Sequence, residues 1–513
     1  MKSLFKTVAT ITFFAILTKV LGFFLRIYLS RMLGPEALGI YQVSISVFMV
    51  LLTIVASGLP LVVSKITARF SVKKDKISEG KLVSSSLIIS VITSLILIGF
   101  VLIFRNTFSM LFTDNQCYTL LVVMLPAVLF SGIYSVFRGA LWGKSNYFGF
   151  CFPELFEQIV RITICVFLIS FGVGSLTPLI SAGLSMTLAC FFSAILAVVL
   201  YFVYGGKLKK PNNIYKEVLK SSTPITGIRV IGSLVQPIIA IIIPARLIAA
   251  GYTSSQALSL FGIAIGMTLP LLFIPIALVG SLSMALIPDI STALTQNDDA
   301  HISNRISSSL TFTLFVNFLI IPLFIGAGEN IGIFFFSNEM SGVLLSSAAW
   351  MILPLSLTNI TSSILNALGM ELKSFLNYLA GSIFLFLGLW VLPQFMGIKA
   401  LIVSMGICVT ITTTLNIWMI KRKVKLKLGL AKPLILMSLF TLPTAALTFF
   451  MTNLLNGLMP LFFNLAISCS LGGVMFILLC IIFNIINIQK TFVRFKSESF
   501  KGFRRKSKFK KHI

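Results

Sequence analysis

Five charged residues fall inside long apolar stretches of this sequence, where an ionised side chain is costly. Lys19 and Arg26 lie seven residues apart, Glu157 and Arg161 lie four apart, and Arg229 stands alone. An ionised group at the centre of a bilayer costs at least about 2.5 kcal/mol, so such residues normally face a cavity or a partner. Four cations against one carboxylate predict an interior that attracts anions. Guanidinium forks and an ammonium suit a phosphate or pyrophosphate group.

The spacing of these residues indicates which of them can act together. Seven residues are nearly two helical turns, so Lys19 and Arg26 share one face, with Gly22 between them keeping that face open. The Glu157 and Arg161 side chains can pair on one face of their helix. We therefore expect four cations to bind an anionic pyrophosphate in a cavity and one carboxylate to act as their charge partner or as a coupling group: Lys19, Arg26, Arg229 and Arg161, with Glu157.

Each of these residues also has a simpler interpretation. Long basic side chains can extend to the membrane surface, which would account for Lys19 and Arg229. Arg161 can serve solely as the charge partner of Glu157. Arg26 can lie at the outer membrane surface, in contact with water. The sequence leaves both interpretations open for each residue.

The sequence contains none of the motifs that we searched for as signs of catalysis or metal binding. Neither a Walker phosphate loop nor an HExxH sequence occurs, and His301 and His512 lie in predicted cytoplasmic segments. The seven cysteines form no CxxC pair and lie mostly in apolar stretches, which favours packing over a disulfide framework or a zinc site. The sequence therefore predicts a protein that is not an enzyme and that needs no cofactor or metal.

The elements that must position these residues are membrane helices. Of 513 residues, 57% are hydrophobic and 11% charged, and the mean hydropathy is +1.02, which excludes a soluble protein. A bilayer core about 30 Å thick needs roughly 20 apolar residues per helix. We expect fourteen such helices, near 7–29, 40–64, 82–104, 117–137, 153–173, 178–204, 222–245, 258–287, 308–326, 343–367, 376–394, 398–420, 433–454 and 460–487.

The distribution of basic residues tests this number of helices and orients the chain. With the amino terminus inside, the cytoplasmic segments hold 33 of the 41 basic residues, and the outer loops with their edges hold four. The net charge of +27 therefore reflects basic residues concentrated on the cytoplasmic side and does not indicate a protein that binds nucleic acid. Both termini are expected in the cytoplasm. The tail 488–513 interleaves basic residues with phenylalanines, which suits a topology anchor at anionic lipids of the inner leaflet.

The expected helices group into two lobes of six that share local sequence. PEALGIY at 35–41 resembles SQALSLF at 255–261, and SGLPLVVS at 57–64 resembles GSLSMALIP at 280–288. Such a parallel repeat is typical of transporters that work by alternating access. We expect a first lobe, a basic cytoplasmic linker, a second lobe, a basic cytoplasmic loop, two further helices and a basic tail, at 1–204, 205–221, 222–420, 421–432, 433–487 and 488–513.

Four segments resemble one known family. They are TKVLGFFLRIYLSRMLGPEALGIYQ at 18–42, SGLPLVVSKITA at 57–68, ELFEQIVRI at 154–162 and FGIAIGMTLPLLFIPIALVGSLSMALIPDIS at 261–291. They are similar to polysaccharide flippases of the multidrug, oligosaccharidyl-lipid and polysaccharide exporter superfamily, and within it to the stage V sporulation protein B group, which is related to the lipid II flippase MurJ. The resemblance covers most of the first 300 residues.

This resemblance implies a fold, a substrate and a membrane. Two six-helix lobes would form a V around a cationic cavity, and two last helices would form a groove for a lipid tail. The implied work is to move undecaprenyl-pyrophosphate-linked saccharides, such as a lipid II-like precursor for spore cortex or wall polysaccharide, across a bacterial plasma membrane. The family's cavity arginines correspond to Lys19 and, about one residue out of register, to Arg26, and a basic residue at a cavity entrance corresponds to Lys65. The seventh helix departs from some members because it lacks an acidic residue.

Three other functions remain open from the sequence. A multidrug or cation exporter of the same fold would need an essential buried acid, and a membrane glycosyltransferase or ligase would need a carboxylate or histidine cluster at a membrane face. A scaffold without transport would recruit cell-wall or sporulation enzymes through its tail. The partners expected are therefore a lipid-linked oligosaccharide, anionic lipids at the tail and cell-wall synthesis proteins.

Overall fold

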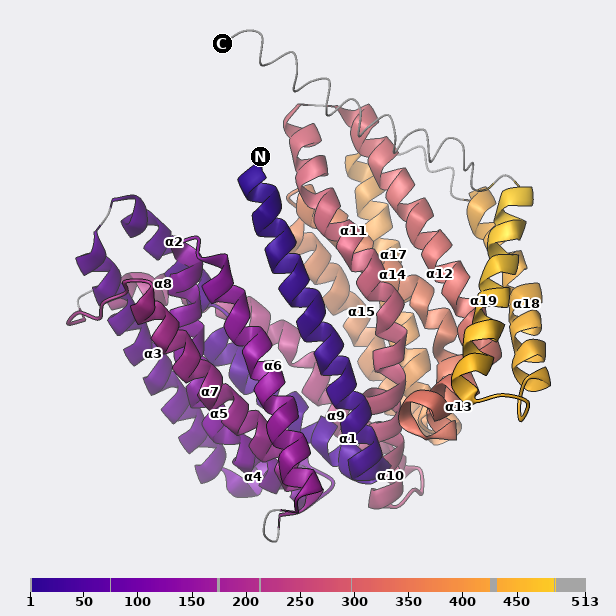
Figure 1. Cartoon of the computed structure of the whole chain (residues 1–513), viewed down its shortest axis with the longest axis horizontal. Helices are drawn as coiled ribbons and strands as arrows, with labels where there is room; N and C mark the ends of the chain where they lie inside the picture. The colour runs from indigo at the N-terminus through magenta and orange to yellow at the C-terminus, as the bar shows by residue number, and fades with distance from the viewer. Residues whose placement is uncertain are drawn as a thin grey trace. The chain divides into compact units, whose positions relative to one another are not determined.

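The computed structural model describes residues 2–73, 75–172, 176–211, 214–296, 298–424, 431–483 and 485, and within them it contains helices and no strand. The predicted tail 488–513 and residues 425–430 of the predicted 421–432 loop lie outside the described residues. Figure 1 shows the helices in chain order. The all-α membrane fold expected from the sequence is confirmed.

Twelve helical segments in the described part of the chain are long and apolar enough to cross a membrane. The first, Thr10–Val72, covers two of the predicted helices, since it runs through α1 (Lys2–Ala56) and α2 (Leu59–Val72). The predicted helix near 153–173 is α6 (Tyr147–Ser170), whose charged residues interrupt its apolar run, and it is not among the twelve. Each of the fourteen predicted ranges is thus largely helical.

The chain divides into two compact units, which do not coincide with the expected lobes. The first unit comprises Met1–Pro270 and Phe386–Leu401, and the second comprises Leu271–Leu385 and Ile402–Ile513. The expected boundary at 205–221 is not the division between them, because α8 (Ile214–Ser233), α9 (Val235–Ala249) and α10 (Ser254–Phe261) pack against α1. The two six-helix lobes stay a prediction.

The first unit is built around α1, which packs on α6 along its length (Figure 1). Gly34 has a non-helical backbone, with φ of 74° and ψ of 173°, and Pro35 follows it, so α1 consists of two helices that meet at this residue, in agreement with the predicted helices near 7–29 and 40–64. The other helices of this unit are α3 (Lys76–Ile103), α4 (Arg105–Leu111), α5 (Asn115–Gly143), α7 (Pro178–Val203), the π-helix η1 (Gly262–Thr268) and α16 (Pro393–Met396).

Side-chain caps begin several of these helices where the sequence offers a short polar residue. The carboxylate of Asp75 accepts a hydrogen bond from the Ser78 backbone N–H at the start of α3. Asn146 caps α6 in the same manner, through the Gly149 backbone N–H. These caps satisfy backbone donors that have no partner inside the helix. One buried apolar cluster then joins α2, α3, α5 and α7, with Val218 contributed by α8.

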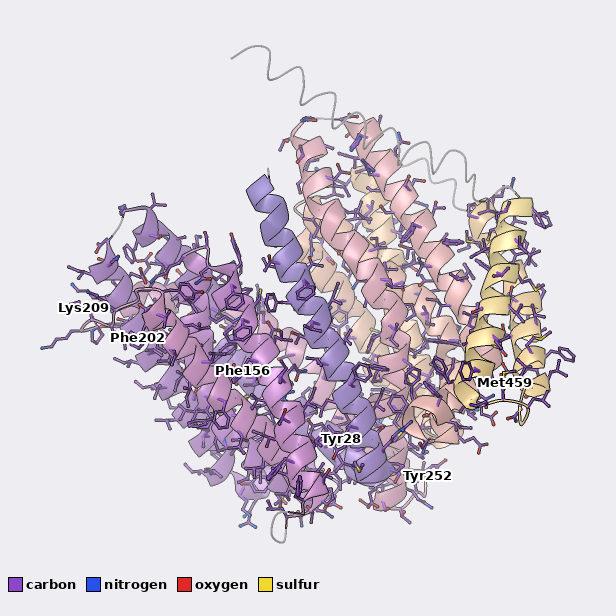
Figure 2. All side chains as sticks on the ribbon, in the orientation of Figure 1. Tyr28, Phe156, Phe202, Lys209, Tyr252 and Met459 are labelled. Carbon is purple, nitrogen blue, oxygen red and sulfur yellow. The ribbon has the colours of Figure 1, made fainter. Side chains whose placement is uncertain are left out.

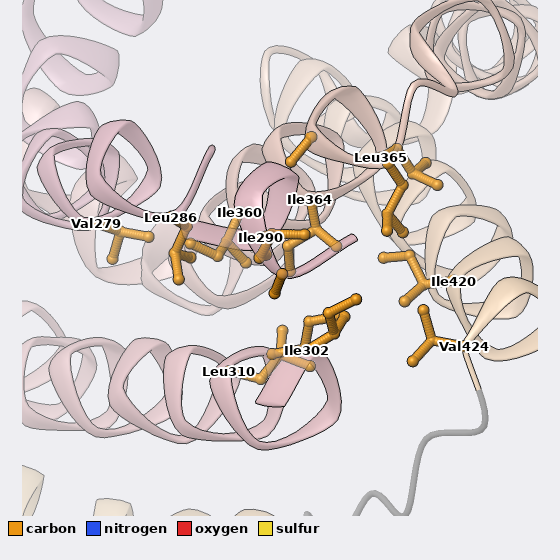
Figure 3. Close-up of a cluster of buried hydrophobic side chains, with 14 of the residues drawn as sticks. Val279, Leu286, Ile290, Ile302, Leu310, Ile360, Ile364, Leu365, Ile420 and Val424 are labelled. Carbon is orange, nitrogen blue, oxygen red and sulfur yellow. The ribbon is translucent and has the colours of Figure 1, made fainter. Parts of the chain in front are cut away.

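The second unit has its own apolar core, shown in Figure 3. This core joins four helices, α11 (Leu269–Thr295), α12 (Asp299–Phe336), α14 (Ile352–Ala367) and α17 (Lys399–Lys423). Beside it runs a buried seam of neutral polar groups, in which Asn377 donates to Asn416 at 2.8 Å and Asn416 donates to Thr361 at 3.2 Å. The remaining helices of the unit are α13 (Glu339–Ala348), the 3-10 helix η2 (Ala349–Met351), α15 (Glu371–Val391), α18 (Ala431–Leu454) and α19 (Leu461–Ile482).

Candidate functional site

Lys19 and Arg26 are both exposed on α1, and the described residues place no carboxylate within ion-pair distance of either. Between them, Gly22 faces α6 so closely that a Cβ atom there would lie 3.0 Å from Nε2 of Gln158. The expectation that Gly22 keeps this face open is therefore wrong, since the Gln158 side chain occupies the space that the glycine leaves. Gly22 instead permits α1 and α6 to approach each other.

A stripe of exposed apolar side chains lies on a different face of α1. Four apolar side chains are strongly exposed and recur at helical spacing: Phe13, Ile16, Val20 and Phe24. At 100° per residue, this stripe is centred about 120° away from Lys19 and Arg26. The two cations therefore share a face that is distinct from the apolar stripe.

Glu157 and Arg161 form the ion pair that their spacing predicts. A guanidinium nitrogen of Arg161 lies 2.7 Å from Oε1 of Glu157, and the two side chains are 13% and 18% exposed. The Cys190 thiol of α7 donates weakly to the same oxygen at 3.9 Å. Nε of Arg161 is buried and has no hydrogen-bond acceptor among the described residues.

Arg229 lies on α8 at the junction between α1 and α2. Its Nη1 donates to the backbone carbonyl oxygen of Ser57 at 2.8 Å, just beyond the end of α1. A cation is favourable at the carbonyl end of a helix, and α1 has no basic residue in its own last turn. A Cβ atom on Gly58 would lie 2.2 Å from Oγ1 of Thr226, so α8 crosses the junction in close contact. Arg229 remains exposed while it makes this bond.

The Ser57–Gly58 junction is a feature that the sequence interpretation missed, because it was placed inside one continuous helix at 40–64. The signal was present as the turn-forming letters SGLP within an apolar run. Lys65 lies on α2, seven residues or nearly two turns beyond this junction, and its side chain is exposed. All six candidate residues therefore belong to the first unit.

Two further ion pairs in the first unit were also missed. Arg138 of α5 pairs with Glu154 of α6 and lies over the Phe150 ring at 4.2 Å. Lys144 pairs with Glu79 at 2.7 Å. The sequence analysis placed both cations in a cytoplasmic segment. It missed the pairs because their partners are distant along the chain. In the described part of the chain no group of histidine, cysteine and acidic residues is arranged to hold a metal ion.

Comparison with known proteins gives consistent relatives. The chain is 27% identical over 382 residues to the stage V sporulation protein B of Bacillus subtilis (strain 168), an alignment that covers 71% of this chain and 73% of the relative. It is 24% identical over 360 residues to the lipid II flippase MurJ of the same organism, with 63% of this chain and 64% of the relative covered. The resemblance identified from the four sequence segments is confirmed.

Solved structures with the same fold include two transporters. A lipid II flippase MurJ in an inward closed conformation matches with a TM-score of 0.71 at 15% identity, over 92% of this chain and 98% of that one. An inward-facing multidrug resistance transporter of the MATE family matches with a TM-score of 0.67 at 16% identity, over 80% of this chain and 94% of that one. A family model described as polysaccharide biosynthesis protein matches residues 4–294. This multi-pass membrane protein therefore belongs to the polysaccharide biosynthesis protein family.

Proposed function

We propose that this protein moves a saccharide linked through a pyrophosphate to undecaprenol, as in a lipid II-like precursor for spore cortex or wall polysaccharide, across a bacterial plasma membrane. The observation that carries the proposal is the cationic face of α1, where Lys19 and Arg26 are exposed away from the apolar stripe. The relatives named as a lipid II flippase and as a sporulation protein support this substrate class. Movement would proceed by alternating access of the two predicted lobes, 1–204 and 222–420.

The physical need for such a device comes from the headgroup. Each polar group of a saccharide that enters hydrocarbon without a hydrogen-bond partner costs several kcal/mol, so unassisted crossing is slow. A pyrophosphate carries negative charge across the same barrier. Cations held on a helix that already spans the membrane lower this cost, and guanidinium groups bind phosphate oxygens in a bidentate manner.

The candidate residues take different parts in this proposal. Lys19 and Arg26 bind the pyrophosphate, and Arg229 extends the cationic surface from α8 while its bond to Ser57 fixes its position. Arg161 adds positive charge that Glu157 neutralises until substrate enters, which makes Glu157 the charge partner or coupling group. Lys65 attracts the headgroup at the cytoplasmic entrance. Both termini lie in the cytoplasm, and the tail binds anionic lipids and cell-wall synthesis proteins.

The test is transport of a fluorescent undecaprenyl-pyrophosphate saccharide between the leaflets of proteoliposomes. Lys19→Gln with Arg26→Gln removes two charges and, since the structure gives neither side chain an ion pair with the described residues, breaks no salt bridge. The matched control is Lys209→Gln with Lys210→Gln, which changes the net charge equally on an exposed segment before α8.

We expect wild type and the control to transport and the Lys19 and Arg26 variant to lose transport at equal reconstitution. Equal transport by the variant and the control would remove the cationic face from the mechanism. If folded wild type moves no substrate while removal of 488–513 abolishes its function in cells, the scaffold interpretation replaces the flippase. A pH gradient that accelerates wild type but not Glu157→Gln would assign the coupling role to Glu157.

A further inference from the structure

The segment that follows α7 has a fixed path over the start of α3. The Tyr201 hydroxyl of α7 donates to the carbonyl oxygen of Lys207 at 3.3 Å. A Cβ atom on Gly206 would lie 2.5 Å from the Tyr201 ring, and one on Gly80 of α3 would lie 2.3 Å from the Lys207 carbonyl oxygen. Residues 205–210 therefore pack as a docked segment against two helices, although they form no helix themselves.

The docked segment rests on a buried polar cluster. Tyr201 is 0% exposed, and its hydroxyl lies 3.5 Å from Oε1 of Glu79. The same oxygen pairs with the Lys144 ammonium at 2.7 Å. A buried polar cluster whose members are paired holds its parts in one arrangement. The backbone at Lys207 is therefore held in place by residues of α3, α5 and α7.

Exposed lysines are concentrated on the docked segment and on the adjacent ends of α2 and α3: Lys73, Lys76, Lys207, Lys209 and Lys210. None of the five forms an ion pair with a residue that the structure describes. The stem of Lys209 crosses the start of α3, because a Cβ atom on Gly80 would lie 3.1 Å from its Cγ atom. Figure 2 shows Lys209 at the edge of the first unit. Asp75, between Lys73 and Lys76 in sequence, is engaged as the cap of α3. This surface therefore carries an excess of positive charge.

Apolar side chains are exposed among these lysines. Val72, Ile77 and Leu208, each next to one of the five lysines in sequence, are 86%, 58% and 42% exposed. Lysine stems are themselves apolar up to the ammonium group. A surface that combines exposed apolar side chains with cations suits the boundary between lipid headgroups and acyl chains. Water alone would leave the three apolar side chains unfavourably exposed.

The length of α3 places this surface at headgroup depth. The uncharged stretch 82–103 alone is long enough to cross a bilayer core about 30 Å thick. Residues 76–81 at the start of α3 therefore extend beyond the core, together with the docked segment that contacts Gly80. The distribution of basic residues predicts that this end is cytoplasmic. The inner leaflet carries anionic lipids, which attract lysines that lie near its surface.

We infer that the linker face, which comprises residues 72, 73, 76, 77 and 207–210, binds the phosphate groups of anionic phospholipids in the inner leaflet. A topology signal needs basic residues near helix ends but no fixed path of the chain. The fixed backbone at Lys207 favours a binding site, since a segment that is already ordered loses less conformational freedom when lipid binds. The inference is independent of the proposed transport, because this face contacts the membrane and not the substrate.

The first experiment titrates phosphatidylglycerol into the purified protein in a neutral detergent and follows the thermal unfolding midpoint. The variant is Lys73→Gln with Lys76→Gln and Lys207→Gln. The matched control removes three exposed cations elsewhere on the predicted cytoplasmic side: Lys220→Gln, Lys421→Gln and Lys423→Gln.

We expect phosphatidylglycerol to raise the midpoint of wild type and control, and the variant to need about tenfold more lipid for half of the effect. Phosphatidylcholine with the same acyl chains should raise the midpoint little. Equal responses of variant and control to phosphatidylglycerol overturn the site, since they would reflect general attraction to basic residues. Equal stabilisation of wild type by the two lipids overturns it as well.

A second experiment tests the fixed path without changing any charge. Tyr201→Phe keeps the ring and removes the hydroxyl that holds the Lys207 carbonyl oxygen. The matched control is Tyr134→Phe, since the buried Tyr134 hydroxyl has no hydrogen-bond partner among the described residues. We expect Tyr201→Phe to weaken the response to phosphatidylglycerol several-fold and Tyr134→Phe to leave it unchanged. Equal responses of these two variants overturn the preorganised site.

Poly-glutamate is the probe for the alternative occupant, an acidic protein partner. Stabilisation of wild type by phosphatidylglycerol but not by poly-glutamate supports the lipid site, whereas stabilisation by poly-glutamate alone overturns it. None of these measurements reads transport, so failure of the proposed function would leave their outcome unaffected.

Discussion

The ammonium group of Lys144 lies 2.7 Å from Oε1 of Glu79 and 4.9 Å from the centre of the Tyr201 ring. These residues come from the end of α5, the start of α3 and the end of α7, and the Glu79 and Lys144 side chains are 8% and 16% exposed. The Tyr201 hydroxyl also donates to the carbonyl oxygen of Lys207 at 3.3 Å. The cluster therefore holds together the ends of α3, α5 and α7 and the backbone at Lys207.

We predict that Lys144→Met destabilises the protein by about 3 to 5 kcal/mol, because it leaves the Glu79 carboxylate buried without its cation. Adding Glu79→Gln should recover much of this loss. The control is Arg69→Met, which breaks an exposed pair with Glu217 and should cost no more than about 1 kcal/mol. Thermal unfolding of purified protein in detergent compares these three variants with wild type. Equal losses for Lys144→Met and Arg69→Met would contradict a structural role for the buried pair.

Substitution of Gly22 tests whether transport depends on the close approach of α1 to α6. Gly22→Val should displace the Gln158 side chain, move the cationic face and reduce lipid transport at least several-fold while the protein remains folded. Gln158→Ala should restore part of the activity, since it removes the atoms nearest the new side chain. Gly99→Val is the matched control, because nothing lies within 4 Å of a Cβ atom at that position. Failure of Gln158→Ala to rescue would show that the contact is not what limits transport.

The glycines at the contact of α1 with α10 and η1 should differ in their tolerance of a methyl group in a fixed order. Gly262→Ala and Gly39→Ala place a methyl group against backbone carbonyl oxygens, so both should lower the unfolding midpoint strongly. Gly266→Ala meets only the Leu38 side chain, which can rotate away, and should be milder. Gly99→Ala should have no adverse effect. If Gly266→Ala is the most damaging of the four, the packing of this crossing differs from the structure.

Asp75 gives a pH dependence outside the membrane-spanning segments. Hydrogen bonds from Ser78 lower the pKa of this carboxyl below its ordinary value of 3.8. A lowered pKa in the folded protein means that the cap stabilises α3 above the ordinary value, and that this stabilisation is lost as pH falls through the lowered one. Protection of the first α3 amides from hydrogen exchange, corrected for the intrinsic rate, should therefore fall at strongly acid pH. Asp75→Asn caps without titrating and should abolish that dependence.

Hydropathy and charge predicted most of the fold because each membrane helix satisfies its own backbone hydrogen bonds. Each helix must also be apolar and long enough to cross the bilayer, so its own sequence is enough to locate it. The ranges near 82–104, 117–137 and 178–204 therefore agree with α3, α5 and α7 within a few residues. The prediction of helix boundaries failed where a neighbouring helix determines the local structure. The expected break near residues 30–39 is confirmed at Gly34, where two helices meet, but the junction at Ser57 and Gly58, where α8 crosses, was missed.

The sequence by itself determined that the chain spans a membrane many times, that charged residues lie inside apolar stretches, and that Glu157 and Arg161 pair. All three follow from local composition or from spacing within one helix. Only the tertiary structure decided that Gln158 fills the space at Gly22, that Arg229 binds the end of α1, and that Gly39 of α1 packs against the backbone of Leu258 in α10. Those contacts join residues 136 to 219 positions apart, where packing of whole helices, rather than local preference, sets the distance.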